Sequence, residues 1–155
     1  MWETYVDSDG GYSFRYLAPP WELVTDADDE HPTIAVEPDP DGVGDSTTTG
    51  VLQARFKVVV FRRAQTAEAA AESDAEMLLD LGADTVETTS FKSARGREGL
   101  HSAAVLSDRK LRAVYHDLPG GGSVAMQAVG RDAVDGADFT LLLRGLEPSW
   151  DEAAP

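Results

Sequence analysis

The sequence contains no cysteine, which excludes disulfides, thiolate metal sites and cysteine nucleophiles. No apolar run approaches the roughly 18 residues of a membrane-spanning helix, so we expect no transmembrane segment. No basic-then-apolar signal opens the chain. We expect a location outside the cytoplasm, with an export segment missing from this sequence; the alternative is a cytoplasmic protein.

Basic residues are also scarce. The 13 Lys and Arg are opposed by 28 Asp and Glu, which gives a formal net charge of −15. No Lys or Arg occurs between Arg15 and Arg55. A surface this negative repels nucleic acid and anionic lipid, and the sequence therefore predicts no nucleic-acid partner.

What remains is typical of one globular domain. The chain has 155 residues, of which 42% are hydrophobic and 26% charged, and a chain of this size can bury a core without disulfides or metals. We predict a single domain over residues 1–146 and a polar tail over 147–155, which we expect to fray.

Apolar periodicity predicts the order of elements. We expect strands over 4–6, 12–17, 33–37 and 51–63, a helix over 66–81, strands over 97–106, 110–117 and 123–130, and a last helix over 135–146. Strands in runs with helices between them are typical of the α+β class. The predicted fold is an antiparallel sheet of about six to seven strands with helices packed on its faces, an α-β-α sandwich.

A short motif near the start carries a family resemblance. It reads Gly11-Tyr12-Ser13-Phe14-Arg15-Tyr16, followed by Pro19-Pro20-Trp21. With the order of elements, this motif resembles the PsbP-like family, which includes the extrinsic photosystem II subunit, bacterial lipoproteins and the Ran-binding Mog proteins. The resemblance implies an α-β-α sandwich that binds or assembles rather than catalyses, and an exported protein if it is a bacterial member. The lipobox cysteine of the lipoproteins is absent.

Few residues indicate catalysis or transition-metal binding. No Gly-x-Ser-x-Gly elbow is present, and Ser102 follows His101 directly, so the two side chains would face opposite ways on a strand. His101 and His116 could be cross-strand neighbours that bind zinc with Asp117 or Glu98. We favour two histidines on a half-exposed sheet face, because compact metal-ligand spacing is absent.

The acidic segment 26–45 holds the candidate functional residues. Loops carry function more often than cores do, so a first cluster is our candidate surface for a protein partner: Asp26, Asp28, Asp29 and Glu30. A second cluster is our candidate calcium site, because carboxylate-rich loops with glycine suit this cation: Asp39, Asp41 and Asp45. The EF-hand pattern is incomplete there, since Val43 stands where a ligand is needed.

These observations lead to one functional prediction and two alternatives. We predict a non-enzymatic binding or assembly-accessory domain with an unknown protein partner and no cofactor, and fold analogy carries most of that prediction. The first alternative is a calcium-binding domain that uses the acidic loop. The second is a hydrolase whose catalytic residues the sequence does not reveal.

Overall fold

A computed structural model describes residues 2–7, 11–17, 21–24, 33–36, 57–106, 109–130 and 137–148. The elements within them are β1 (Trp2–Asp7), β2 (Tyr12–Leu17), β3 (Trp21–Val24), β4 (Thr33–Val36), β5 (Lys57–Arg63), α1 (Ala67–Asp80), β6 (Val86–Lys92), β7 (Glu98–Leu106), β8 (Arg109–Asp117), β9 (Ser123–Gly130) and α2 (Ala137–Arg144). The predicted strand over 51–63 is present from Lys57 onward, and its first part lies outside these residues.

The strands form two sheets. Seven strands pair in the order β3-β4-β5-β9-β8-β7-β6, with every neighbouring pair antiparallel, while β1 and β2 pair only with each other. The predicted α+β class and antiparallel pairing are therefore confirmed. The prediction of one sheet is wrong, because the first hairpin forms a separate two-stranded sheet.

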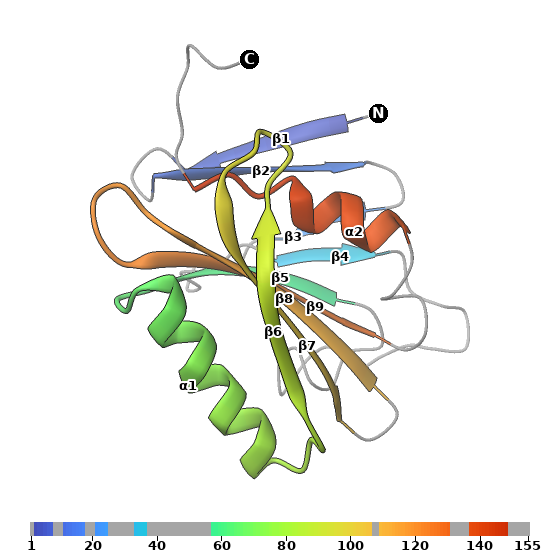
Figure 1. Cartoon of the computed structure of the whole chain (residues 1–155). Coiled ribbons are helices and arrows are strands. Elements are labelled where there is room, and N and C mark those ends of the chain that lie inside the picture. Colours follow the sequence, from blue (N-terminus) through green and yellow to red (C-terminus); the bar gives the residue numbers. More distant parts are fainter. Residues whose placement is uncertain are drawn as a thin grey trace.

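The layers also differ from a sheet covered by helices alone. Helix α1 lies on one face of the seven-stranded sheet, and α2 lies on the other face together with the β1–β2 sheet (Figure 1). In an α-β-α sandwich, helices alone would cover this second face. Here the β1–β2 hairpin covers part of it. Within the described ranges, no helix is both long enough and apolar enough to cross a bilayer.

A hydrophobic core lies on each face of the large sheet. Small residues on α1, Ala67, Ala70 and Ala71, pack against Ala113 and Ala125 of the sheet, so the helix can approach the strands closely. The other core is built on bulkier side chains, and its largest members are fully or almost fully buried: Tyr12, Phe14, Met126, Leu142, Leu143 and Leu146.

The motif strand β2 behaves as its alternation predicts. Tyr12, Phe14 and Tyr16 are buried in the core, while Arg15 between them is exposed. Tyr5 of β1 stacks on Phe14 with the ring centroids 5.0 Å apart. One face of the hairpin therefore belongs to the core, and its other face points outward.

Strand β6, like the short strand β3, is not among the strands that the sequence predicted. Val86–Lys92 contains no apolar alternation, and most of its side chains are exposed. It forms one edge of the large sheet and pairs only with β7. An edge strand with polar side chains buries too little apolar surface to leave a periodic signal.

The first residues beyond α2, 145–148, pack against the rest of the domain. Glu147, which the sequence placed in the polar tail, is 5% exposed. Its backbone exchanges two hydrogen bonds with Ser13 of β2, 2.8 and 3.1 Å long. The ordered domain thus extends past residue 146, because this segment docks on the first hairpin.

Candidate functional site

A buried carboxylate joins α1 to the sheet. Asp74 lies on the inward face of α1 and is 5% exposed. It accepts hydrogen bonds from Arg63 Nη1 over 2.6 Å and from the Tyr115 hydroxyl over 2.8 Å. Burial and the Asp74 carboxylate raise the pKa of Tyr115 well above its usual value, so this hydroxyl stays protonated and donates.

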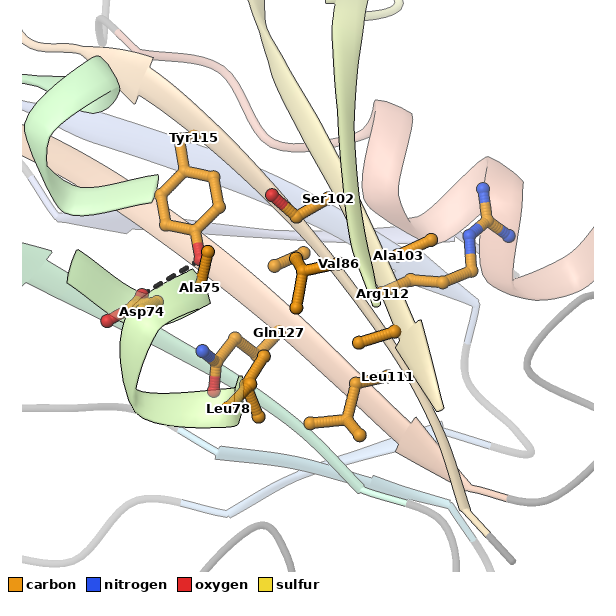
Figure 2. A pocket seen from close by; sticks show the side chains of 12 residues that line it. Asp74, Ala75, Leu78, Val86, Ser102, Ala103, Leu111, Arg112, Tyr115 and Gln127 are labelled. Atoms are coloured by element: carbon orange, nitrogen blue, oxygen red, sulfur yellow. Dashed lines mark hydrogen bonds between the residues drawn. The ribbon is translucent and has the colours of Figure 1, made fainter. Parts of the chain in front are cut away.

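A small pocket lies next to this cluster, between α1 and the strands (Figure 2). Its wall is mostly apolar and includes Leu78, Val86 and Leu111, together with the hydrogen-bonded pair Asp74 and Tyr115. The empty volume is about 300 Å³ including solvent at the mouth, but the space open to the centre of a water molecule is about 10 Å³. That space holds roughly one water, not an organic substrate.

His116 of β8 is fully buried. Its Nδ1 lies 3.1 Å from the carbonyl oxygen of Glu98, and because a carbonyl only accepts, Nδ1 carries the proton. Burial lowers the pKa of His116, although the Glu98 carbonyl and the Glu147 and Asp117 carboxylates oppose that shift. The imidazole is therefore held neutral, with Nε2 unpaired within the described residues.

Gly99 makes room for this histidine. A Cβ atom at Gly99 would lie 2.5 Å from His116 Nδ1 and 2.5 Å from the carbonyl oxygen of Tyr115. Real Cβ atoms do not approach a backbone oxygen so closely, and only glycine therefore fits beside the buried imidazole. The sequence offered no signal for this pairing, because it depends on the register between β7 and β8.

The second sheet histidine has different partners. His101 of β7 stacks on Phe91 with the ring centroids 5.6 Å apart, and its Nε2 accepts a hydrogen bond from Arg112 Nε over 3.1 Å. Arg112 also donates to the Thr140 hydroxyl of α2 over 2.8 Å. Burial, and then the Arg112 charge, lower the pKa of His101.

The zinc hypothesis fails on this geometry. His101 and His116 each hydrogen-bond elsewhere, and Asp117 accepts from the Ala67 N–H at the start of α1 over 2.8 Å. Across the described residues, no group of three or more His, Asp or Glu side chains is placed to hold a metal ion. The register pairs His101 with Val114, so the two histidines are not directly opposite each other as expected. The preferred interpretation of two histidines on a half-exposed face is wrong for His116, which is fully buried.

Ser102 and His101 do not act together either. Ser102 is buried, and its hydroxyl lies 3.1 Å from the Thr88 hydroxyl, whereas His101 bonds to Arg112. Adjacent residues on a strand face opposite sides of the sheet, as the sequence analysis expected. This pair therefore offers no nucleophile and base in contact.

A third buried cluster fixes the segment after α2. The Ser93 hydroxyl donates to Glu147 Oε1 over 2.8 Å, and the Arg95 N–H donates to Glu147 Oε2 over 3.4 Å. Ser93 is 1% exposed. The carboxylate thus secures the β6–β7 turn and is enclosed by the fold.

The outer face of the β1–β2 sheet presents large side chains to solvent. Trp2 and Val6 are each 41% exposed, and the Arg15 guanidinium lies over the Trp2 ring, 5.2 Å from its centroid. The sequence analysis missed this surface, although alternation along β1 places Trp2 and Val6 on one face.

The sequence-predicted site residues lie outside the described residues. This holds for the candidate partner surface and for the candidate calcium site: Asp26, Asp28, Asp29, Glu30, Asp39, Asp41 and Asp45. Both stay predictions. The acidic stripe on α1, by contrast, is exposed as a solvated helix face should be: Glu68, Glu72, Glu76 and Asp80.

Comparisons with known proteins give a likeness in structure alone. No protein-family model matches the chain, and no curated protein matches its sequence. Among solved structures, it is similar to the solution structure of cyanobacterial PsbP (CyanoP) from Synechocystis sp. PCC 6803. The match has a TM-score of 0.58 at 12% identity and covers 95% of this chain and 92% of that one. The chain therefore has a PsbP-like fold.

Proposed function

We propose that this chain is a non-enzymatic binding domain that docks on a protein partner. The observation that carries the proposal is the outer face of the β1–β2 sheet. Its inner face fills the core, yet Trp2 and Val6 on the outer face remain 41% exposed. Large apolar side chains that remain exposed together favour an interaction surface over a purely structural role.

The composition of this face also fits protein binding. Tryptophan and arginine are enriched among the residues that contribute most to protein–protein affinity. Here Arg15 covers the Trp2 ring at a centroid distance of 5.2 Å. A partner that buries the pair would gain apolar contact area and a cation–π interaction shielded from water.

The buried polar groups support a role without catalysis. Asp74 is paired with Arg63 and Tyr115, and Glu147 is enclosed by the β6–β7 turn. The pocket beside Asp74 has room for roughly one water. These groups therefore serve the fold in our account, whereas a catalytic set would face a cleft that admits substrate.

Two finer ideas remain part of the proposal. First, the PsbP-like fold supports an accessory role in an assembly, as the family resemblance implies. That family includes bacterial lipoproteins and the Mog proteins, and a relation to these branches is part of the proposal. The acidic cluster is a second candidate surface for the same function: Asp26, Asp28, Asp29 and Glu30. The sequence predicts a loop there, and loops carry function more often than cores do.

A capture experiment with surface variants tests the function. The immobilised wild-type chain is expected to retain a specific protein from extract of its native cells, and the Trp2→Ser/Val6→Ser variant to lose it. The matched control is Met77→Ser/Leu81→Ser, which removes apolar side chains exposed elsewhere. Equal retention by wild type and Trp2→Ser/Val6→Ser contradicts the outer face as the docking surface.

The same assay tests the acidic cluster. If the cluster is the docking surface, replacing its four carboxylates with Asn and Gln abolishes capture while the outer-face variant retains its partner. Absence of any specifically retained protein with the wild-type chain contradicts the binding function itself.

A further inference from the structure

Although the protein is acidic, five cationic residues lie in one region of the folded domain, around the β6–β7 turn and the end of α2. Arg15 lies in β2, Lys92 ends β6, Arg95 and Arg97 lie in the β6–β7 turn, and Arg144 ends α2. All of them are exposed. We call these five residues the basic end. They come from three separate parts of the sequence, and only the fold brings them together.

Backbone contacts bring these segments together. The Ala94 N–H donates to the Arg144 carbonyl over 2.8 Å, which joins the β6–β7 turn to the end of α2. Gly145 lies against β2, since a Cβ there would be 3.0 Å from the Arg15 carbonyl oxygen. Figure 1 shows the same arrangement, with the β6–β7 turn rising past α2 to the β1–β2 sheet.

The turn itself is held in one shape. Ser93 and Arg97 are linked twice, from Ser93 N–H to the Arg97 carbonyl over 2.9 Å and from Arg97 N–H to the Ser93 hydroxyl over 3.1 Å. Gly96 takes a φ of +83° inside the turn, which glycine adopts without strain. Because the charges are carried on a fixed frame, binding costs less ordering entropy.

Two of these cations have no ion-pair partner among the described residues. Two carboxylates lie in the same region. Glu98 is opposite Lys92 in the β6–β7 register, and Glu147 is enclosed by hydrogen bonds. Within the described residues, Arg97 and Arg144 form no ion pair. The basic end therefore offers a local positive potential on a chain with a net charge of −15.

We propose that the basic end binds an acidic segment of the protein partner, an inference that rests on the binding function proposed above. Arg15 belongs to both surfaces because it covers Trp2 on the outer face. An acidic segment that crosses from Trp2 to the β6–β7 turn would contact aromatic and guanidinium groups in succession. Such groups are enriched at protein interfaces.

A protein segment fits better than a membrane or a nucleic acid. A net charge of −15 repels an extended polyanion that runs along many faces of the domain. A short segment responds mainly to charges within about 8 Å, the screening length at physiological ionic strength. It can therefore be attracted by the basic end despite the acidic remainder of the chain.

The direct test is fluorescence anisotropy of a labelled peptide in which Glu and Asp alternate with Leu. We expect binding to the full chain that weakens as salt is raised, and no binding of the same peptide with Gln and Asn in place of the acids. The Arg95→Glu/Arg97→Glu/Arg144→Glu variant should weaken binding about tenfold, the effect of three exposed charge contacts.

Lys110→Glu provides the matched control. It changes the net charge as much as Arg97→Glu does, but at the opposite end of the large sheet. Arg97→Glu is expected to weaken peptide binding more than Lys110→Glu, with both variants folded by circular dichroism. Equal effects, or no binding of the acidic peptide to wild type, overturn the inference.

Two further outcomes separate the proposals. Binding to phosphatidylglycerol vesicles without binding to the acidic peptide overturns the inference in favour of a membrane surface. If the triple variant captures the cellular partner as well as wild type does, while Trp2→Ser/Val6→Ser loses it, the binding function stands and the acidic-segment inference fails.

Discussion

The hydroxyl of Tyr115 donates to Oδ2 of Asp74 over 2.8 Å, which ties the interior strand β8 to the inward face of α1. Arg63 binds the other carboxylate oxygen over 2.6 Å. The side chain of Arg63 is 24% exposed and that of Asp74 is 8% exposed, so the pair sits at the margin of the core. Three elements thus share one charged group, and the stability of the α1 layer should depend on it.

Replacing Asp74 tests this dependence. Asp74→Ala leaves the Tyr115 hydroxyl and the Arg63 guanidinium without their acceptor, and we expect a loss of about 2 kcal/mol in the free energy of unfolding. Urea denaturation measures it. Asp80→Ala on the exposed side of the same helix is the control, with an expected effect of at most about 0.5 kcal/mol. Equal losses would contradict a stabilising role for the cluster.

A methyl group at Gly99 should be costly. Gly99→Ala places a Cβ 2.5 Å from the Tyr115 carbonyl and from His116 Nδ1, and relieving such overpacking costs about 1–3 kcal/mol. Thermal unfolding should show a lower midpoint. Gly120→Ala is the control, because nothing lies within 4 Å of its added Cβ. A Gly99→Ala midpoint equal to that of Gly120→Ala would refute the close approach.

The buried His116 predicts a pH dependence of stability. Its pKa in the folded chain is lower than the unfolded value of 6.5, so below that pH the unfolded state binds more protons. The stabilisation is present above pH 6.5 and is lost as the pH falls toward the folded pKa, by at most about 1.4 kcal/mol per pH unit. Chemical denaturation between pH 7.5 and 5.5 measures the slope, with both pH values chosen to bracket the unfolded pKa.

His116→Gln separates this contribution from that of the carboxylates. The variant cannot bind the extra proton in its unfolded state, so its stability should fall less over the same pH range. His101→Gln should have a weaker effect of the same sign, because His101 is only half-buried. If His116→Gln follows the wild-type slope, the imidazole is not the group that titrates.

The Glu147 carboxylate should stabilise the contact between the β6–β7 turn and the segment after α2. Glu147→Gln keeps the size of the side chain but weakens the hydrogen bonds from Ser93 and the Arg95 N–H, and we expect a loss of about 1 kcal/mol. Hydrogen exchange should show faster exchange in the β6–β7 turn. Glu76→Gln on the exposed face of α1 serves as the reference. Unchanged protection in the turn would contradict this role.

Periodicity predicted the elements that bury one face. The alternation of Tyr12, Phe14 and Tyr16 was sufficient to place β2, and the alanine and leucine spacing was sufficient to place α1. Strand β6 could not be found this way, because Val86–Lys92 is polar and lies at a sheet edge. The separate β1–β2 sheet could not be found either, because hydrophobic alternation does not say which strand is the neighbour.

The candidate site was harder to predict than the fold. Asp74 could have been found, since it occupies an inward position between Ala70 and Leu78 on α1, where a carboxylate needs a partner. The burial of Glu147 and the grouping of the basic end could not be predicted, because both depend on tertiary contacts between segments that are distant in the sequence. The acidic segment was conspicuous in composition, but composition does not say what a surface contacts.

The most direct test of the central claim is site-specific photo-crosslinking in native cells, with a benzophenone amino acid at position 2. The account predicts an adduct with one protein that bears an acidic segment, absent when the crosslinker is placed at Thr88 on the edge strand, and diminished in the Arg95→Glu/Arg97→Glu/Arg144→Glu background. No adduct at position 2, or adducts equally abundant at position 88, would contradict a binding domain that docks through the β1–β2 face.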